Sequence, residues 1–464
     1  VRDPSRMAEV LNRVIEKAFR GSAPAQINVP RDYWTQVIDI DLPPIVRFER
    51  QGGGKKAIDE AAKILSNAKF PVILSGAGVV IGNAIEDCKK LAEKLDAPVC
   101  NGYQHNDSFP GNHPLAVGPL GYNGSKAAME LISKADVVLA LGTRLNPFST
   151  LPGYGIDYWP KNATIIQVDM NPDRIGLTKK VTVGICGDAK LVSQQILEKL
   201  SSNAGDNGRE DRKNLIHQTK SSWLQTLTSL DHEDDDPGTV WNKEARERDK
   251  ERMSPRQAWR AIQAGMPDDV IISSDIGNNC AIGNAYPTFE KGRKYLAPGL
   301  FGPCGYGFPS ILGAKIGCPD TPVIGFAGDG AFGISMNEMS SCARKEWPSI
   351  TMVIFRNYQW GAEKRNSILW FDDNFVGTEL DPELSYAKVA TACGLKGVTV
   401  KTMEETTSAI KQSCLDQKKG ITTFIEVILN QELGEPFRRD AMKKPVKVAG
   451  INTKDMRPQI LKNG

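Results

Sequence analysis

The 464-residue sequence has no long hydrophobic run, little histidine and no closely spaced pair of cysteines. No stretch approaches the roughly 18–20 apolar residues that a membrane-spanning helix needs, and no pattern of a secretory signal is present. The nine cysteines are scattered and never spaced C-x-x-C, which argues against a zinc site or a disulfide framework. We therefore expect free thiols in a reducing compartment, no membrane partner and a cytoplasmic enzyme.

An excess of charge of one sign is also missing. The 58 Lys and Arg residues nearly balance the 55 Asp and Glu residues, which gives a formal net charge of +3. This balance gives no reason to expect nucleic acid or an anionic membrane as a partner. Hydrophobic residues make up 40% of the chain and charged residues 24%, as in ordinary globular proteins. At this length we expect two or three domains.

Two long segments alternate helix and strand patterns. Residues 53–202 place apolar runs such as FPVILS and DVVLALG between amphipathic helices, and residues 254–432 repeat the alternation. Both segments predict an α/β fold, with two doubly wound parallel-sheet domains in all. A charged linker, residues 203–253, is expected to join them as a solvated helix and loops, and a basic tail, residues 433–464, follows.

The first 35 residues are too few for a domain. They contain one amphipathic helix, over residues 6–21, and a predicted short strand, AQINVP, over residues 25–30. One helix and one strand cannot bury a core by themselves. We therefore expect residues 1–35 to be the end of a further domain.

The most informative stretch runs from Gly328 to Asn357. Gly-Asp-Gly closes an apolar strand, a helix is expected to begin at Ala331, and a second apolar strand ends at Asn357. The carboxyl ends of parallel strands lie at one edge of a sheet, so Asp329 and Asn357 are expected to meet there. Their oxygens suit Mg²⁺, and the glycines with free helix N–H groups suit phosphate. The stretch predicts a site for a metal-bridged diphosphate.

Two further loops of the same domain have polar or glycine-rich sequences. DIGNN, residues 275–279, ends a strand and offers a turn at Gly277 with amide donors at Asn278 and Asn279. GPCGYGFP, residues 302–309, is a glycine turn that leads into a helix.

Together these motifs resemble the signature of the thiamine-diphosphate (ThDP) enzymes, in the acetolactate-synthase-like family. Residues 331–356, 26 in number, separate Gly330 from Asn357, a gap typical of that signature. The family usually has an Asn-Asn pair where this chain has Arg356-Asn357, and a histidine of its diphosphate loop is absent from DIGNN. The resemblance implies ThDP and Mg²⁺ as cofactors, with Asp329, Asn357 and the carbonyl of Gln359 as metal ligands. The cofactor-binding residues that it implies are Gly277, Asn278, Asn279, Gly302, Cys304, Gly328, Asp329, Gly330, Ala331, Asn357, Gln359, Gly361 and Ala362.

Two positions have more than one interpretation. In the family, the residue at the position of Cys304 wedges beneath ThDP, whereas a nucleophilic thiol is the rival interpretation. Residues a few positions after the metal asparagine usually face the substrate, which makes Glu363 a catalytic candidate with Lys364 and Arg365 beside it. A solvated charged turn is the alternative for these three residues.

The segments NYQWGAEKRNSILWFDDNFVGTEL (357–380) and GEPFRRDAMKKPV (434–446) are similar to family members that act on sulfoacetaldehyde. This resemblance implies conversion of sulfoacetaldehyde and phosphate to acetyl phosphate and sulfite. In the basic tail, Arg438 and Arg439 are candidates for recognising these anions, or they belong to a solvated face. An acetolactate-synthase-like carboligase or decarboxylase acting on pyruvate is the alternative reaction.

A third interpretation is a non-catalytic cofactor-binding fragment. In the family, the activating glutamate lies in an N-terminal pyrimidine-binding domain, of which residues 1–35 resemble only the last part. We therefore do not expect the printed chain to be active alone. The family site forms between two subunits, so a homodimer or homotetramer is implied.

Two features of the first α/β segment stay open. The motif SGAGVVIGNA, with Asp169 at the end of a later strand, fits either a nucleotide site or a topological relative that binds nothing. The loop at residues 101–114 concentrates His105, Asn106, Asp107 and His113 without metal-ligand spacing, which favours a structural loop.

Overall fold

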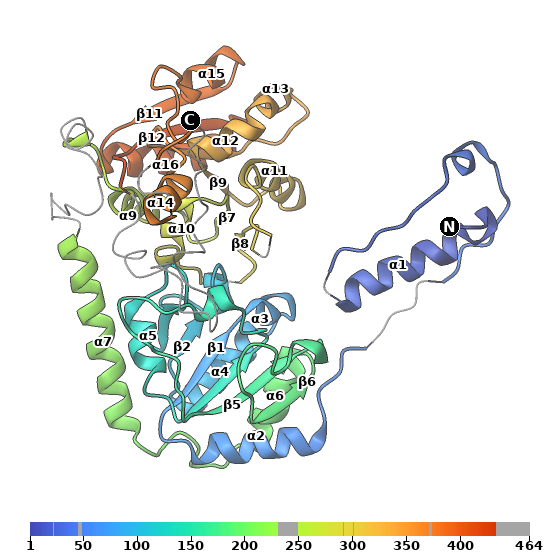
Figure 1. The fold of residues 1–464 in the computed structure, drawn as a ribbon, viewed down its shortest axis with the longest axis vertical. Helices are drawn as coiled ribbons and strands as arrows, with labels where there is room; N and C mark the ends of the chain where they lie inside the picture. The colour runs from blue at the N-terminus through green and yellow to red at the C-terminus, as the bar shows by residue number, and fades with distance from the viewer. Residues whose placement is uncertain are drawn as a thin grey trace, which may run out of the picture.

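The structure, a computed structural model, describes residues 1–21, 23–44, 49–230, 249–290, 292–299, 301–370 and 374–432. Two α/β units lie one above the other in Figure 1, and the segment before residue 45 extends to the side of them. No helix among the described residues is long and apolar enough to cross a membrane.

The first unit is a six-stranded parallel sheet with strand order β3-β2-β1-β4-β5-β6. Its strands are β1 (Pro71–Ser75), β2 (Val99–Asn101), β3 (Ala116–Pro119), β4 (Val137–Leu141), β5 (Thr164–Asp169) and β6 (Val183–Cys186). Its helices are α2 (Lys55–Asn67), α3 (Ala77–Ile81), α4 (Ile85–Leu95), α5 (Lys126–Ile132) and α6 (Ala189–Lys199). All residues of β1 and β4 are buried, as expected for strands covered by helices on both faces.

The second unit is also a six-stranded parallel sheet, with strand order β11-β12-β10-β9-β7-β8. Its strands are β7 (Ile271–Ser274), β8 (Tyr295–Leu296), β9 (Val323–Gly328), β10 (Thr351–Arg356), β11 (Lys396–Val400) and β12 (Thr423–Ile428). Its helices are α9 (Pro255–Gly265), α10 (Asn278–Ile282), α11 (Gly307–Gly317), α12 (Asp329–Ser335), α13 (Met339–Cys342), α14 (Gly361–Trp370), α15 (Tyr386–Ala392) and α16 (Met403–Gln417). The two sheets confirm the predicted fold class.

Local sequence explains where the helices of the second unit begin. Ser254 caps α9 and Thr402 caps α16. In each case the hydroxyl accepts from the backbone N–H three residues later, and the side chain of that residue accepts from the N–H of the cap. Two hydrophobic clusters then cover the two faces of the sheet, one centred on Trp259 and the other on Phe308 and Phe332. The sheet is thereby buried on both sides, and its loops at the strand ends are held on a rigid scaffold.

Two local expectations differ from the structure. Residues 25–30, predicted as a strand, pair with no strand among the described residues. A strand needs a neighbour to satisfy its backbone N–H and C=O groups, so this segment stays outside both sheets. Before them the helix α1 (Met7–Gly21) forms as predicted, and Val1 and Tyr33 close the segment on itself by hydrogen bonds to Asn28 and Arg2.

The charged linker contains a helix, α7 (Arg209–Leu230), that belongs to the first unit rather than to solvent. Arg212 is 1% exposed, and its guanidinium donates to five backbone carbonyls. The acceptors are the carbonyls of Lys69, Leu95, Asp96, Gly205 and Asn207. The helix therefore packs along the side of the unit, as Figure 1 shows.

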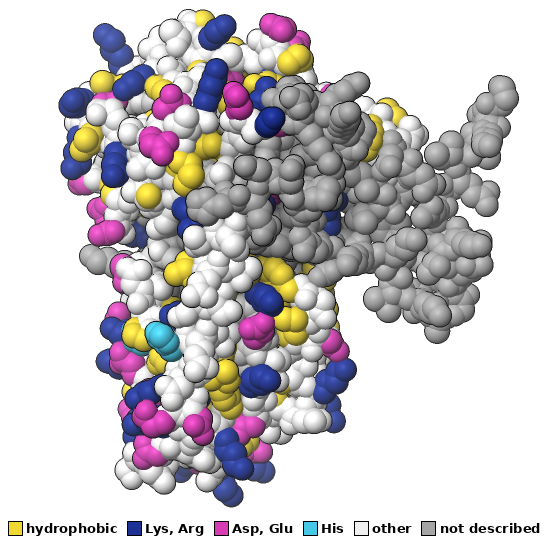
Figure 2. Space-filling view, turned by 90° about the vertical axis from the view of Figure 1, so that its left-hand side faces the viewer, with side chains coloured by type: hydrophobic (Ala, Val, Ile, Leu, Met, Phe, Trp, Pro, Cys, Tyr) yellow, Lys and Arg dark blue, Asp and Glu magenta, His cyan; other side chains and the backbone are white. Residues whose placement is uncertain are grey.

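The face that carries α7 shows Lys and Arg side chains interspersed with Asp and Glu, without a large area of one sign (Figure 2). This distribution accords with the small net charge of the chain.

Candidate functional site

The site predicted from sequence lies where the strand order of the second sheet changes direction. β7 and β9 are neighbours in the sheet, and the connection after β7 runs to β8 on one side whereas the connection after β9 runs to β10 on the other. In open α/β sheets, ligands bind at such a point, outside the carboxyl ends of the strands. Gly328 pairs with Phe355, so Asp329 and Asn357 leave adjacent strands at the same edge, as predicted.

Asp275 organises the two loops nearest the switch point. One of its carboxylate oxygens accepts from the N–H groups of Ile276, at 2.8 Å, and Gly305, at 3.1 Å. The other accepts from the N–H of Gly307 at 2.7 Å. Burial raises the pKa of Asp275, and these bonds oppose the shift. The residue thus joins DIGNN to the 302–309 loop, a role that sequence reasoning did not assign.

The glycine loop at residues 302–309 adopts a conformation that requires glycine. Gly302 has φ +65° and Gly305 has φ +86°, in the left-handed region. Cys304 between them is exposed, but its thiol is partly desolvated, and this together with the charges of Asp275 and Glu363 raises its pKa. A raised pKa keeps the thiol protonated, which disfavours the nucleophilic interpretation.

Asp329 is 1% exposed and is held on both oxygens. Its Oδ1 accepts from the N–H of Gly330 at 3.0 Å. Its Oδ2 accepts from the N–H of Tyr358 at 2.7 Å and from Nη1 of Arg356 at 3.0 Å. Burial raises its pKa to about 6, against the opposing charge of Arg356. The helix α12 begins at Asp329, two residues before the expected start at Ala331, because Gly328 takes the N-cap position.

Asn357 and Gln359 follow β10 and are both buried, at 2% and 3% exposure. Tyr358 between them has φ +61°, which turns the chain sharply at this point. The side chain of Gln359 donates to the carbonyl of Gln431 at 3.1 Å. The backbone bonds around Gln359 use the carbonyl of Tyr358 and the N–H of Trp360, so they leave the Gln359 carbonyl for another partner.

Several buried polar atoms of the site have no hydrogen-bond partner. These atoms show whether the implied cofactors fit, because a bound cofactor would supply the missing partners. Both polar atoms of the Asn278 side chain, Oδ1 of Asn279 and Oε1 of Gln359 are buried without a hydrogen bond. Buried polar atoms are normally satisfied, so a missing ligand is the simplest explanation. A Cβ on Gly361 would lie 3.1 Å from the Asn278 amide nitrogen, and one on Gly277 or Gly328 would meet nothing within 4 Å. There is room for a diphosphate beside the Asn278 amide nitrogen, the one unpartnered donor of this set, whereas the three unpartnered oxygens call for a donor or a cation.

The donor set also suits Mg²⁺. Asp329 would contribute a carboxylate oxygen, Asn357 an amide oxygen and Gln359 a backbone carbonyl, all of them hard ligands. Among the described residues, no group of three or more His, Cys, Asp or Glu is placed to hold a metal. A softer metal such as zinc therefore has no alternative centre in the described part of the chain.

The residues after Gln359 take different environments. Gly361 and Ala362 begin α14, and Glu363 is exposed on it. Lys364 is fully buried and paired with Glu379, so the solvated-turn alternative is wrong for this residue. Arg438 and Arg439 lie outside the described residues, and their roles stay predictions.

The open features of the first unit also have definite positions. The glycine motif lies at the switch point between β1 and β4, beside a cavity of about 320 Å³ that Arg144, Arg174 and Asp169 help to line. Both interpretations, a nucleotide site and a topological relative that binds nothing, therefore stay open.

The loop at residues 101–114, which contains His105 and His113, contacts the second unit. Its Asn106 side chain donates to the carbonyls of Asn284 and Pro287 at 2.7 and 2.9 Å. The loop therefore joins the two units.

Comparison with known proteins agrees with these observations. Residues 58–199 match the family "Thiamine pyrophosphate enzyme, central domain", and residues 275–427 match "Thiamine pyrophosphate enzyme, C-terminal TPP binding domain". The crystal structure of benzoylformate decarboxylase from Polynucleobacter necessarius superposes with a TM-score of 0.69, covering 93% of this chain and 75% of that one. At 19% identity this likeness shows the fold alone.

Two sequence relatives are much more similar. A probable sulfoacetaldehyde acetyltransferase of Rhizobium meliloti (strain 1021) is 78% identical over 99% of this chain and 78% of its own length. A sulfoacetaldehyde acetyltransferase of Roseovarius nubinhibens is 73% identical over 99% of this chain and 76% of its own. The chain therefore belongs to the thiamine pyrophosphate enzymes and, within them, to the family of the sulfoacetaldehyde acetyltransferases.

Proposed function

We propose that the chain is a ThDP- and Mg²⁺-dependent acyltransferase that converts sulfoacetaldehyde and phosphate to acetyl phosphate and sulfite. The observation that carries this proposal is the 78% identity to a relative named for that activity, over 99% of the chain. The buried, unpartnered amide atoms of Asn278, Asn279 and Gln359 support the cofactor part independently, since they lie on segments that follow β7 and β10 near the switch point.

ThDP, when bound, supplies the nucleophilic carbon and the electron sink of the reaction. The chain supplies the positioning. Asp329, Asn357 and the Gln359 carbonyl would hold Mg²⁺, and Asn278 and Asn279 with the neighbouring glycines would receive the diphosphate. Gly302 and Cys304, in the 302–309 loop that Asp275 fixes, would help to hold the remainder of the cofactor.

Recognition of two anions, a sulfonate and a phosphate, calls for cationic side chains. Arginine matches such oxygens with paired N–H groups, and Arg438 and Arg439 are our candidates. Glu363, exposed at the start of α14, is the candidate for proton transfer. Lys364 is not a substrate contact in this proposal because Glu379 already pairs with it inside the protein.

Sulfite release from sulfoacetaldehyde, measured with and without phosphate, tests the reaction. The chain is assayed alone and joined to the part of the Rhizobium relative that it does not cover, with ThDP and Mg²⁺ present. We expect phosphate-dependent sulfite release and acetyl phosphate formation from the joined protein, and neither from its Asp329→Ala variant. Acetolactate formation from pyruvate without sulfite release would instead support the carboligase alternative.

Binding separates an enzyme part from a module. Calorimetry of the chain alone with ThDP and Mg²⁺ should show binding at the diphosphate end even where turnover is absent.

We also propose a cytoplasmic location and assembly into a dimer or tetramer. Light scattering after size-exclusion chromatography tests the assembly. A monomer of the joined protein with full activity would contradict the assembly.

A further inference from the structure

Arg356 occupies the position where the family usually has the first asparagine of its pair, and its side chain is entirely buried. Nη1 donates to Oδ2 of Asp329 at 3.0 Å, and Nη2 donates to the carbonyl of Leu384 at 2.9 Å and to that of Asp381. Nε lies 3.7 Å from Oε1 of Glu426. The guanidinium thus connects the metal-ligand carboxylate to a loop and to a second buried carboxylate.

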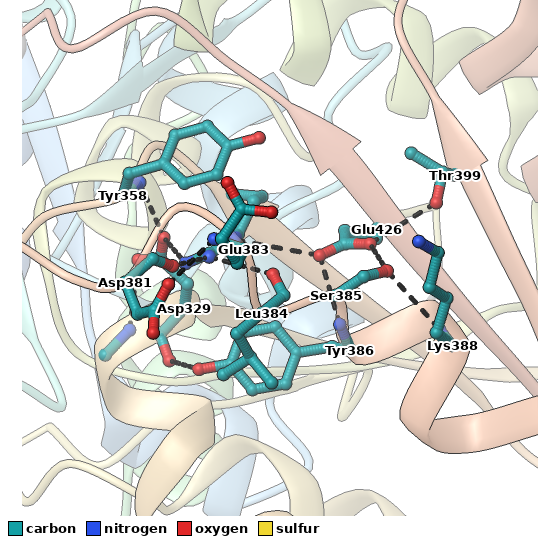
Figure 3. Close-up of polar contacts among 12 residues, drawn as sticks. Asp329, Tyr358, Asp381, Glu383, Leu384, Ser385, Tyr386, Lys388, Thr399 and Glu426 are labelled. Atoms are coloured by element: carbon teal, nitrogen blue, oxygen red, sulfur yellow. Dashed lines mark hydrogen bonds and ion pairs between the residues drawn. The ribbon is translucent and has the colours of Figure 1, made fainter. Parts of the chain in front are cut away.

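Aromatic rings enclose the same cation. The guanidinium carbon lies 4.2 Å from the ring centroid of Tyr358 and 5.5 Å from that of Tyr386. Such cation–π contacts favour a charged group that has lost its water. The hydroxyl of Tyr386 also donates to the backbone carbonyl of Asp329 at 2.8 Å (Figure 3). Arg356 is therefore held rigidly rather than at the end of a mobile chain.

Glu426 fixes the far side of this network. It is 2% exposed and accepts from the hydroxyl of Ser385 at 2.7 Å and from the N–H of Tyr386 at 3.1 Å (Figure 3). Thr399 adds a bond at 3.3 Å. Arg356 therefore lies between two fixed carboxylates, Asp329 and Glu426. It is the only cation among the described residues that contacts Asp329.

We propose that Arg356 is an internal counter-cation of the metal site, which holds Asp329 in place before the metal enters and weakens the binding of the metal by repulsion. This inference rests on the proposed ThDP and Mg²⁺ site. A buried carboxylate without a cationic partner is costly, and Arg356 lowers that cost in the metal-free protein. Once a divalent ion binds Asp329, the guanidinium lies one carboxylate group away from it, and like charges at such a separation repel strongly.

The inference makes an unusual prediction about direction. A residue that only braces the site should, when replaced, loosen the ligands and weaken metal binding. A counter-cation, when neutralised, should lower the stability of the metal-free protein and yet tighten metal binding. Tighter metal binding after the charge of Arg356 is removed therefore distinguishes a counter-cation from a residue that only braces the site.

The test uses four variants of the full chain and Mn²⁺ in place of Mg²⁺, followed by electron paramagnetic resonance in the presence of ThDP. Arg356→Asn and Arg356→Gln remove the charge, and Arg356→Lys keeps it. Tyr386→Phe is the matched control, because it loosens the same carboxylate residue at its backbone without changing any charge. Thermal unfolding without ThDP and metal gives the stability of each variant.

We expect the neutral variants to bind Mn²⁺ at least about tenfold more tightly than the original chain and to unfold at lower temperature when metal-free. Arg356→Lys should keep the original affinity. Tyr386→Phe should lose stability with no gain in affinity. Equal or weaker Mn²⁺ binding by a folded neutral variant overturns the inference.

Circular dichroism first establishes which variants fold. If both neutral variants fail to fold, Arg356→Lys decides: the original affinity supports the inference, and tighter binding overturns it. An original chain that binds no Mn²⁺ with ThDP overturns the proposed cofactor site together with this inference. Unaltered affinity in the neutral variants overturns the inference alone.

Discussion

The two glycines of the GDG motif are surrounded differently, and alanine at each position should separate the needs of the ligand from those of the protein. A Cβ on Gly330 would lie 2.7–2.9 Å from three ring atoms of Trp360. A Cβ on Gly328 would meet no atom within 4 Å, and its φ of −70° is open to any residue. Gly330→Ala should therefore disturb the chain itself, whereas Gly328→Ala should disturb only what binds there.

The magnitudes follow from these surroundings. Overpacking by one methyl group costs about 1–3 kcal/mol, and the ring of Trp360 is only part-buried, so we expect about 1–2 kcal/mol for Gly330→Ala. Gly328→Ala restricts the unfolded chain, a gain of about 0.4–1 kcal/mol, but Gly328 is the N-cap of α12 and alanine is less favourable there by about the same amount. We therefore expect little net change in stability. The methyl group of Gly328→Ala would displace the phosphate group from the open space beside it. The loss of one hydrogen bond to a charged phosphate costs about 1.5–3 kcal/mol, which is about tenfold or more in the ThDP affinity.

Urea unfolding without ThDP and metal measures the first effect, and calorimetric titration with ThDP at saturating Mg²⁺ measures the second. We expect Gly328→Ala to be about as stable as the unsubstituted chain, with weakened ThDP binding. Gly330→Ala should lose both stability and affinity. Original ThDP affinity in Gly328→Ala would refute the idea that the open space beside this glycine is kept for the diphosphate.

Three further predictions concern other parts of the chain. Asp275→Ala leaves three loop N–H groups without their acceptor, so urea unfolding should show a loss of about 1–3 kcal/mol for each buried group; an equal loss in Asp275→Asn, which keeps one oxygen, would contradict this. Burial raises the pKa of Asp107 from 3.8 to about 6, so its contribution to stability is present below pH 4 and lost as the pH rises through 6. The unfolding free energy of the original chain relative to Asp107→Asn should fall by up to about 3 kcal/mol over that range, and a flat difference would refute the shift. Arg438→Ala and Arg439→Ala should each raise the KM for phosphate or sulfoacetaldehyde about tenfold in the sulfite assay, whereas unchanged kinetics would assign both to a solvated face.

The location of the site was predictable because the ligands follow strand ends. In parallel sheets the chain returns to the same edge after each strand, so GDG and Asn357 could be placed together from their spacing alone. The strands β3, β6, β8 and β11 escaped prediction, since two to five residues carry too little periodicity to be distinguished from loops. Residues 25–30 show the converse case, in which a strand-like pattern pairs with no strand among the described residues.

Contacts between distant side chains could not be predicted. Arg356 was visible only as a departure from the usual asparagine, and nothing in its sequence neighbourhood indicates Glu426 or Tyr386. Arg212 was hidden for a related reason. Its segment is rich in charge, which ordinarily indicates a solvated face, yet the buried guanidinium finds carbonyl partners supplied by the ends of other elements.

The metal-free site contains two classes of polar group, and this difference bears on the order in which its ligands enter. The charge of Asp329 is already balanced by Arg356, whereas the amides of Asn278 and Asn279 have buried atoms without partners. A diphosphate can accept a hydrogen bond from the unpartnered amide nitrogen of Asn278, and it brings negative charge, which offsets the repulsion between Arg356 and a divalent ion. Metal alone gains neither advantage. We therefore expect Mn²⁺ to bind the chain weakly without ThDP and much more tightly with it, and equal affinities in the two titrations would contradict this order of entry.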